Sequence, residues 1–273
     1  MMRRWPILVT FLVAAAEPVK FYFEYAAVAG AADVSQHLVI RGQSATVIHE
    51  PGYPSVEGDT IGIFRTSVSR EQQEQIAGLV PDHPPSLDVR PDSPAFSIHL
   101  QFEKRDVSLV VPNTPAGGTQ FGALLAAINQ VTAAAMKNPY RAVAFEVAAP
   151  ASIAAGVPAL IRVRLRNPGT QPVKLELNNT VLRVQSTPPP PPPDPNVMPR
   201  PVVWNRIDIA PWQVPAVEVA PRESREVAVR VRFPSAGVFL VRAWFSHPAS
   251  SDPEREEVGG TAISTTARIT VSE

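Results

Sequence analysis

A strict alternation of apolar and polar residues recurs through the second half of the chain and constrains its fold more than any other feature. Over positions 161–166, aliphatic residues alternate with arginines, and positions 227–233 follow a similar scheme, with Pro and Gly in the turns between runs. A period of two is that of a β-strand with one buried face. Because several such strands follow one another without helical periodicity, residues 142–273 are predicted to form a β-sandwich.

The first half of the chain combines strand patterns with two stretches of helical period. Ser69 and Gln72 form a capping-box pattern ahead of one apolar helical face. Thr119 precedes a second apolar stripe over 121–131, which it would cap. Strands followed by a helix, twice, predict an α+β domain over 17–141, with two similar halves and two helices on one face of an antiparallel sheet. The predicted fold class is therefore an α+β N-terminal domain followed by an all-β immunoglobulin-like sandwich.

The chain contains 31 prolines, far above the usual share of about 5%. One run, Pro188 to Pro193, is a low-complexity tract with the composition of a polyproline II rod. The strands between 142 and this run are too few to bury two faces. The run is therefore predicted to lie in a long loop, 186–200, inside the sandwich domain.

The N-terminus has the pattern of a secretory signal peptide. Arg3 and Arg4 precede an apolar stretch that ends on small residues at Ala14 and Ala16. This pattern predicts a signal peptide over 1–16, cleavage before Glu17 and a secreted or periplasmic product. The stretch is too short to span a bilayer, and we expect no membrane span in the mature chain.

Composition and motif searches argue against several classes of chemistry. The formal net charge is zero, so no electrostatic attraction to nucleic acid is expected. The chain has no cysteine, and its five histidines have no metal-binding spacing. It also lacks a nucleophile elbow and a phosphate-binding glycine loop. We therefore expect no enzyme activity, no cofactor and no metal.

Two groups of residues are candidates for a binding surface. The first consists of arginines at every second strand position: Arg162, Arg164, Arg166, Arg230 and Arg232. If their two strands share a sheet, these guanidinium groups face outward together and could bind carboxylates or an anionic polymer; a solvated face is the alternative. The second group is Trp212, in an irregular segment, and Trp244, which points outward if Phe245 points inward. For both tryptophans, packing in the core or at a domain interface is the alternative.

Two resemblances add to this interpretation. Residues 62–80, with Gly30-Ala-Ala and an aromatic strand before them, resemble the emfourin family, whose named member inhibits a thermolysin-like protease. Residues 155–158, 166–169 and 233–239 resemble bacterial immunoglobulin-like accessory modules. The leading hypothesis is an exported, non-enzymatic binding protein whose partner is another protein or an extracytoplasmic polymer. The alternatives are a proteinase inhibitor acting through the emfourin-like domain, and a hydrolase assembled from dispersed Asp, Glu and His.

Overall fold

The structure is a computed structural model. It describes residues 21–28, 36–51, 56–83, 95–112, 121–191, 201–209, 212–214, 216–248, 252 and 254–273. The predicted signal peptide, its cleavage site at Glu17, the helix cap at Thr119 and residues 192–200 of the proline-rich loop lie outside these ranges. No helix within the described ranges is long and apolar enough to cross a membrane.

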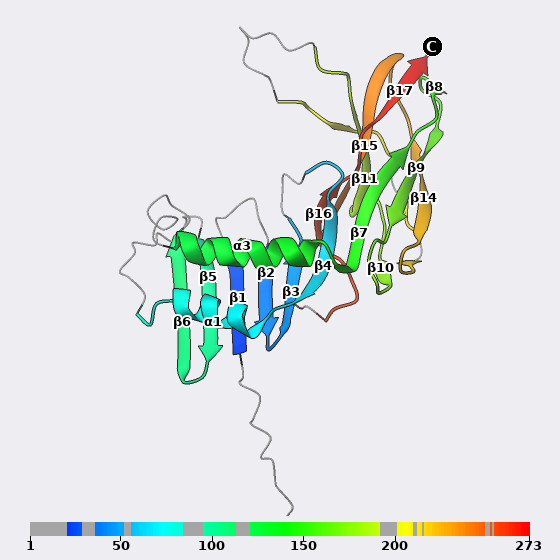
Figure 1. Cartoon of the computed structure of the whole chain (residues 1–273). Coiled ribbons are helices and arrows are strands. Elements are labelled where there is room, and N and C mark those ends of the chain that lie inside the picture. The colour runs from blue at the N-terminus through cyan, green and yellow to red at the C-terminus, as the bar shows by residue number, and fades with distance from the viewer. Residues whose placement is uncertain are drawn as a thin grey trace, which may run out of the picture.

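Strands make up most of the described chain (Figure 1). The N-terminal half contains β1 (Phe21–Val28), β2 (Gln36–Arg41), β3 (Ser44–His49), β4 (Thr60–Ser67), α1 (Arg70–Leu79), β5 (Ala95–Phe102), β6 (Arg105–Pro112) and α3 (Gly122–Met136). The C-terminal half contains β7 (Pro139–Ala148), β8 (Ser152–Ala154), β9 (Ala159–Arg166), β10 (Val173–Leu175), β11 (Leu182–Thr187), β12 (Asn205–Arg206), β13 (Val217–Val219), β14 (Ser224–Val231), β15 (Gly237–His247), β16 (Gly260–Ile263) and β17 (Ala267–Ser272).

One nine-stranded sheet runs through both halves of the chain, in the order β14-β9-β7-β4-β3-β2-β1-β5-β6. The link is the antiparallel pairing of β4 with β7. The predicted fold class is therefore wrong: the protein is mostly β, with two helices in its described part, and no separate α+β domain precedes the sandwich. The two supposedly similar halves of that domain have four strands and two strands, and they are joined edge to edge through β1 and β5.

The fold-class prediction failed because period-two patterns identify a strand but not its partners. In both β4 and β7, four consecutive residues are buried, 61–64 and 142–145. Burial of both faces is the mark of an interior strand that is covered on each side. The predicted domain boundary at 141 falls within β7, and as a statement about independent folding units it stays a prediction.

Two hydrophobic cores lie on opposite faces of the shared sheet. Ile61 and Val143 belong to the C-terminal core, whereas Phe64 and Ala142, on the other face of the same strands, belong to the N-terminal core. Helices α1 and α3 cover the N-terminal core, and Figure 1 shows α3 lying across the strands. The covered face of the sheet therefore changes from one side to the other at β4 and β7.

The C-terminal half is a β-sandwich, which confirms that part of the prediction. A six-stranded sheet has the order β12-β11-β15-β17-β8, with β16 beside β15. It faces β7, β9 and β14 of the nine-stranded sheet across the C-terminal core. Phe145 and Phe245 stack between the two sheets with ring centroids 4.8 Å apart. Such inward-facing side chains form the core of a sandwich.

Local sequence signals account for several element ends. The predicted capping box at α1 is confirmed: the Ser69 hydroxyl accepts from the Gln72 backbone N–H, and the Gln72 side chain accepts from the Ser69 N–H. Gly42, with a φ of 56°, forms the tight turn between β2 and β3.

The loop between β15 and β16 contacts the N-terminal half of the sheet through polar groups. Arg65 forms an ion pair with Glu254 at 2.8 Å. Arg141 donates to the backbone carbonyls of Glu254 and Arg255 at 2.9 and 2.8 Å. Arg255 also pairs with the buried carboxylate of Glu50. These contacts tie the loop to β4, to β7 and to Glu50, which directly follows β3.

Candidate functional site

The structure brings the predicted arginines together on one outer face of the sandwich. Strand β9 pairs with β14, so the two strands that carry the arginines do share a sheet, as the prediction required. Arg232 directly follows β14. The five side chains are exposed and the aliphatic residues between them are buried. We call this set the arginine ladder: Arg162, Arg164, Arg166, Arg230 and Arg232.

Two carboxylates divide the arginine ladder into a paired end and a less paired end. Glu146 of β7 and Glu226 of β14 lie directly opposite Arg164 on its two sides. Glu146 contacts Arg164 at 3.7 Å and Arg166 at 3.6 Å. Glu226 contacts Arg162 at 3.5 Å.

The other end of the ladder is poorer in acidic groups. Arg230 and Arg232 form no ion pair with any described residue. In the strand register Arg230 lies opposite Leu160, and Arg162 lies opposite Ala228. Arg230 therefore lies beside an apolar residue, whereas Arg164 lies between two carboxylates.

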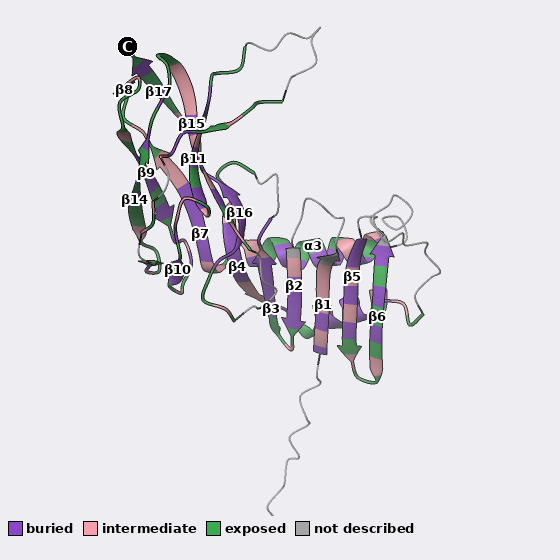
Figure 2. Cartoon of the chain, turned by 180° about the vertical axis from the view of Figure 1, so that it is seen from behind, coloured by how far each residue is buried: buried purple, intermediate pink, exposed green. Residues whose placement is uncertain are grey.

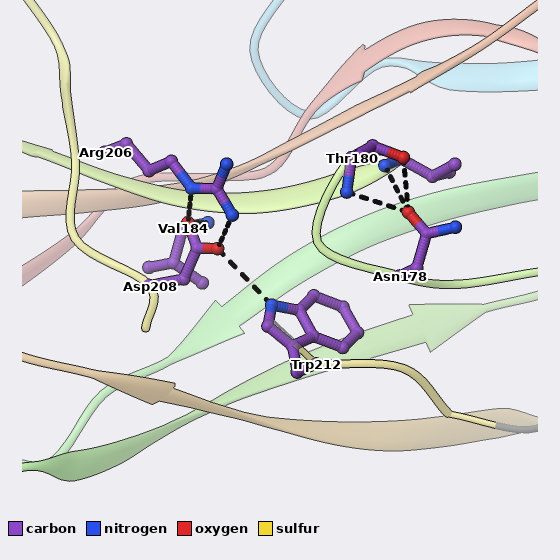
Figure 3. A network of polar contacts seen from close by, with 7 residues as sticks. Asn178, Thr180, Val184, Arg206, Asp208 and Trp212 are labelled. Atoms are coloured by element: carbon purple, nitrogen blue, oxygen red, sulfur yellow. Dashed lines mark hydrogen bonds and ion pairs between the residues drawn. The ribbon is translucent and has the colours of Figure 1, made fainter. Parts of the chain in front are cut away.

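Trp212 lies beside a polar network (Figure 3), whose Asp208 forms an isolated bridge with Val231, between Arg230 and Arg232. Its indole Nε1 donates to the Asp208 carboxylate at 3.3 Å, and the ring packs against the C-terminal core. Arg206 and the Val184 backbone N–H also donate to Asp208. Trp212 is thus half-buried, with its orientation fixed by a buried acceptor.

Trp244 lies on the outer face of the six-stranded sheet, because its neighbour Phe245 is buried in the core. The Arg242 guanidinium is 3.9 Å from the ring centroid of Trp204 and 5.4 Å from that of Trp244. Arg242 also donates to the Gln185 side chain at 3.0 Å. Trp204, which was not predicted as a site residue, thus belongs with Trp244 in a cation–π stack. Trp244 and the arginine ladder lie on the outer faces of different sheets, so the structure does not bring all the predicted site residues into one site.

A second polar group, which the sequence did not predict as a site, lies on the face of the N-terminal sheet that the helices leave open (Figure 2). We call it the Glu24 cluster: Tyr22, Glu24, His37, His99 and Asp106. The Glu24 carboxylate accepts from the Tyr22 hydroxyl at 2.5 Å and contacts His37 Nε2 at 2.7 Å. His99, directly opposite Glu24 in β5, contacts Asp106 at 3.0 Å. A surface hollow of about 410 Å³ lies beside Glu24 and His99.

These contacts shift the pKa values of two groups in opposite directions. Burial alone would raise the pKa of Glu24, but hydrogen bonds from Tyr22 and His37 and the charges of His37 and His99 outweigh it and lower the pKa. Burial, together with the hydrogen bond to Glu24 and its negative charge, raises the pKa of Tyr22 to about 12. Glu24 is therefore held as a carboxylate and Tyr22 as a neutral hydroxyl that donates to it.

Only part of the Glu24 cluster carries a sequence signal. Tyr22 and Glu24 share a face because they are two residues apart in a strand. His37 meets Glu24 diagonally across the β1–β2 pair, and His99 meets it through the β1–β5 pair. These registers depend on strand pairings that local patterns do not determine. Among the described residues, no group of three or more His, Asp or Glu side chains could hold a metal ion.

Comparisons with known proteins give only remote similarities. No sequence model of a known family matches the chain, and no curated protein matches it. Among solved structures it is similar to the CARDB domain of a Pyrococcus furiosus protein, crystallised in complex with di-metal ions, with a TM-score of 0.29 and 12% identity over 50% of this chain and 91% of that domain. A solution structure of that domain gives a TM-score of 0.28 and 15% identity over 49% of this chain and 96% of the domain.

A third similar structure is a β-glucosidase from Erythrobacter marinus, with a TM-score of 0.25 and 15% identity over 48% of this chain and 16% of the enzyme. Similarities this low support no inference about function. The emfourin resemblance and the inhibitor and hydrolase alternatives therefore stay predictions. The same holds for the expectations of export and of a non-enzymatic role.

Proposed function

We propose that the protein is a non-enzymatic binding protein that holds an anionic polysaccharide outside the cytoplasm through the arginine ladder. The observation that carries the proposal is the pairing of β9 with β14, which places exposed arginines at every second position along two adjacent strands. Side chains on one face of a strand repeat about every 7 Å. A polymer with regularly spaced sulfates or carboxylates can contact several such cations at once, and arginine binds both groups through two N–H donors.

The face that carries the arginine ladder has a net positive charge and can attract an anionic ligand, although the formal net charge of the whole chain is zero. The five arginines and the two carboxylates Glu146 and Glu226 give this face a net charge of about +3, since 5 − 2 = 3. The carboxylate contacts are 3.5–3.7 Å long and exposed, and such pairs contribute little to stability. An anionic ligand can displace them at small cost, and it would first engage the less paired Arg230 and Arg232.

The test measures binding of dextran sulfate to the mature chain, with uncharged dextran as the ligand control. The double variant Arg230→Glu and Arg232→Glu should weaken binding about tenfold or more, because each reversal replaces an attraction of ~0.5–1 kcal/mol by a repulsion. Removing the competing acids with Glu146→Gln and Glu226→Gln should strengthen it. Binding should also weaken as salt rises, because these charges are exposed and screened.

The matched control is Arg183→Glu with Arg268→Glu, which makes the same charge change at exposed residues of the six-stranded sheet. This variant should bind dextran sulfate nearly as the wild type does. The proposal is wrong if the control variant loses binding while the ladder variant keeps it, or if dextran sulfate binds no better than dextran.

A further inference from the structure

We infer that the surface hollow beside Trp212 is a second binding site, one that takes an uncharged saccharide. The hollow has a volume of about 420 Å³ and is lined by Asn178, Asn179, Thr180, Trp212 and Gln213. Small-molecule sites in proteins span about 300–1,000 Å³ and combine aromatic walls with a few placed polar groups. The residues that line this hollow are not members of the arginine ladder, and the inference does not depend on the function proposed for the ladder.

The two walls of the hollow are fixed to each other by the backbone. Asn178 forms an isolated antiparallel bridge with Gln213. The Asn179 N–H donates to the Trp212 carbonyl at 3.2 Å, and the Val214 N–H donates to the Leu177 carbonyl at 3.2 Å. The lining residues are therefore held in place before any ligand arrives, which lowers the entropic cost of binding.

The aromatic wall is also held in one orientation. The Asp208 side chain is fully buried, and its carboxylate accepts from the Trp212 indole as well as from Arg206 and Val184 (Figure 3). The negative charge of Asp208 is thus balanced by these donors inside the protein and is not available to a ligand in the hollow. The indole remains as a flat apolar surface of the kind that packs against the C–H face of a sugar ring.

The polar side chains that line the hollow beside the indole are amides and a hydroxyl, all without charge. The Asn178 side-chain oxygen accepts from the Thr180 N–H and hydroxyl and from the Val181 N–H. With this oxygen occupied, the amide N–H₂ of Asn178 keeps its two donors for a ligand. The side chains of Asn179 and Gln213 make no hydrogen bond to any described residue.

This combination selects a ligand with many hydroxyl groups and no charge. Amides both donate and accept, as do sugar hydroxyls, so each can satisfy the other. An ionic ligand would lose hydration without meeting an opposite charge. A neutral saccharide that packs on Trp212 and exchanges hydrogen bonds with Asn178, Asn179 and Gln213 is therefore the occupant that the chemistry favours.

The test is calorimetric titration of the mature chain with three neutral trisaccharides: cellotriose, maltotriose and tri-N-acetylchitotriose. At least one should bind with millimolar or tighter affinity. The double variant Asn179→Ala and Gln213→Ala should weaken that binding at least about tenfold. Trp212→Phe should weaken it as well, while the thermal midpoint shows that each variant is folded.

The matched control is Asn129→Ala with Gln130→Ala, the same two residue types at exposed positions of α3 in the N-terminal half. It should bind the trisaccharide as the wild type does. The inference is overturned if none of the three sugars binds, or if the Asn179/Gln213 variant binds as well as this control. Dextran sulfate binding should be the same in both variants, so failure here is distinguishable from failure of the arginine ladder.

Discussion

At the scale of single residues, Glu24 is the clearest case of a side chain whose ionisation is set by its neighbours. Its carboxylate lies on an otherwise open sheet face, where Tyr22 and His37 both contact it. The hydrogen bonds and nearby positive charge lower its pKa despite partial burial. By linkage, a carboxyl whose pKa is lower in the folded state stabilises the fold at neutral pH, and this contribution is lost as pH falls through the folded-state pKa.

Glu24→Gln should therefore reduce the acid sensitivity of the protein. We expect the thermal midpoint of the wild type to fall more between neutral pH and about pH 3 than that of Glu24→Gln. The range extends into acid because the pKa of Glu24 is lowered. Glu74→Gln serves as control, because Glu74 is an exposed helix residue paired with Arg70. Equal slopes for wild type and Glu24→Gln would contradict the role given to Glu24, and an altered slope in Glu74→Gln would show that the effect is general.

At the scale of elements, β4 depends on a glycine to lie against β7. Gly62 is paired with Ala142 and has a φ of 129°, a conformation that other residues adopt only with strain. A Cβ at this position would lie 2.2 Å from the Arg141 carbonyl oxygen. The close approach of the two strands thus leaves no room for a side chain.

Gly62→Ala should lower the free energy of unfolding by at least about 2 kcal/mol through strain and separation of the strands. Gly78→Ala is the matched control, because a Cβ there meets nothing within 4 Å and alanine favours a helix by about 0.5–1 kcal/mol. Urea denaturation should therefore move the two variants in opposite directions. A Gly62→Ala protein as stable as the wild type would contradict the packing described for β4 and β7.

Element positions followed from the sequence far better than element partners did. The capping pattern at Ser69 and the alternation over 161–166 are local, and both elements lie where they were expected. The pairing of β4 with β7 joins segments about eighty residues apart in the sequence, and no local pattern specifies it. The arginine ladder was predictable because its residues recur within two strands, whereas the Glu24 cluster draws on four strands.

At the scale of the whole molecule, the shared sheet makes the two halves depend on each other. Ile61, from the N-terminal half, is fully buried in the C-terminal core. The loop between β15 and β16 returns to contact Glu50, Arg65 and Arg141. Removing either half would expose the unpaired edge of β4 or β7, and exposed edges promote aggregation.

We expect the mature chain to unfold in one cooperative transition. Scanning calorimetry should give a calorimetric enthalpy equal to the van't Hoff enthalpy, the mark of a two-state process. A fragment covering 142–273 should be less stable than the full chain and prone to aggregate. Two resolved transitions, or a soluble fragment with the midpoint of the full chain, would show instead that the halves fold independently.

The change of covered face at β4 also determines where second-site suppressors of a mutation can lie. Ile61 and Phe64 are three residues apart, yet they pack in different cores. A cavity left by truncating Ile61 can be refilled only from the sandwich, for example by a larger residue at Ala262. A cavity left at Phe64 can be refilled only from the N-terminal core, for example at Ala127 of α3. In a selection for restored folding, neighbouring positions of this one strand should therefore draw their compensating substitutions from different halves of the chain.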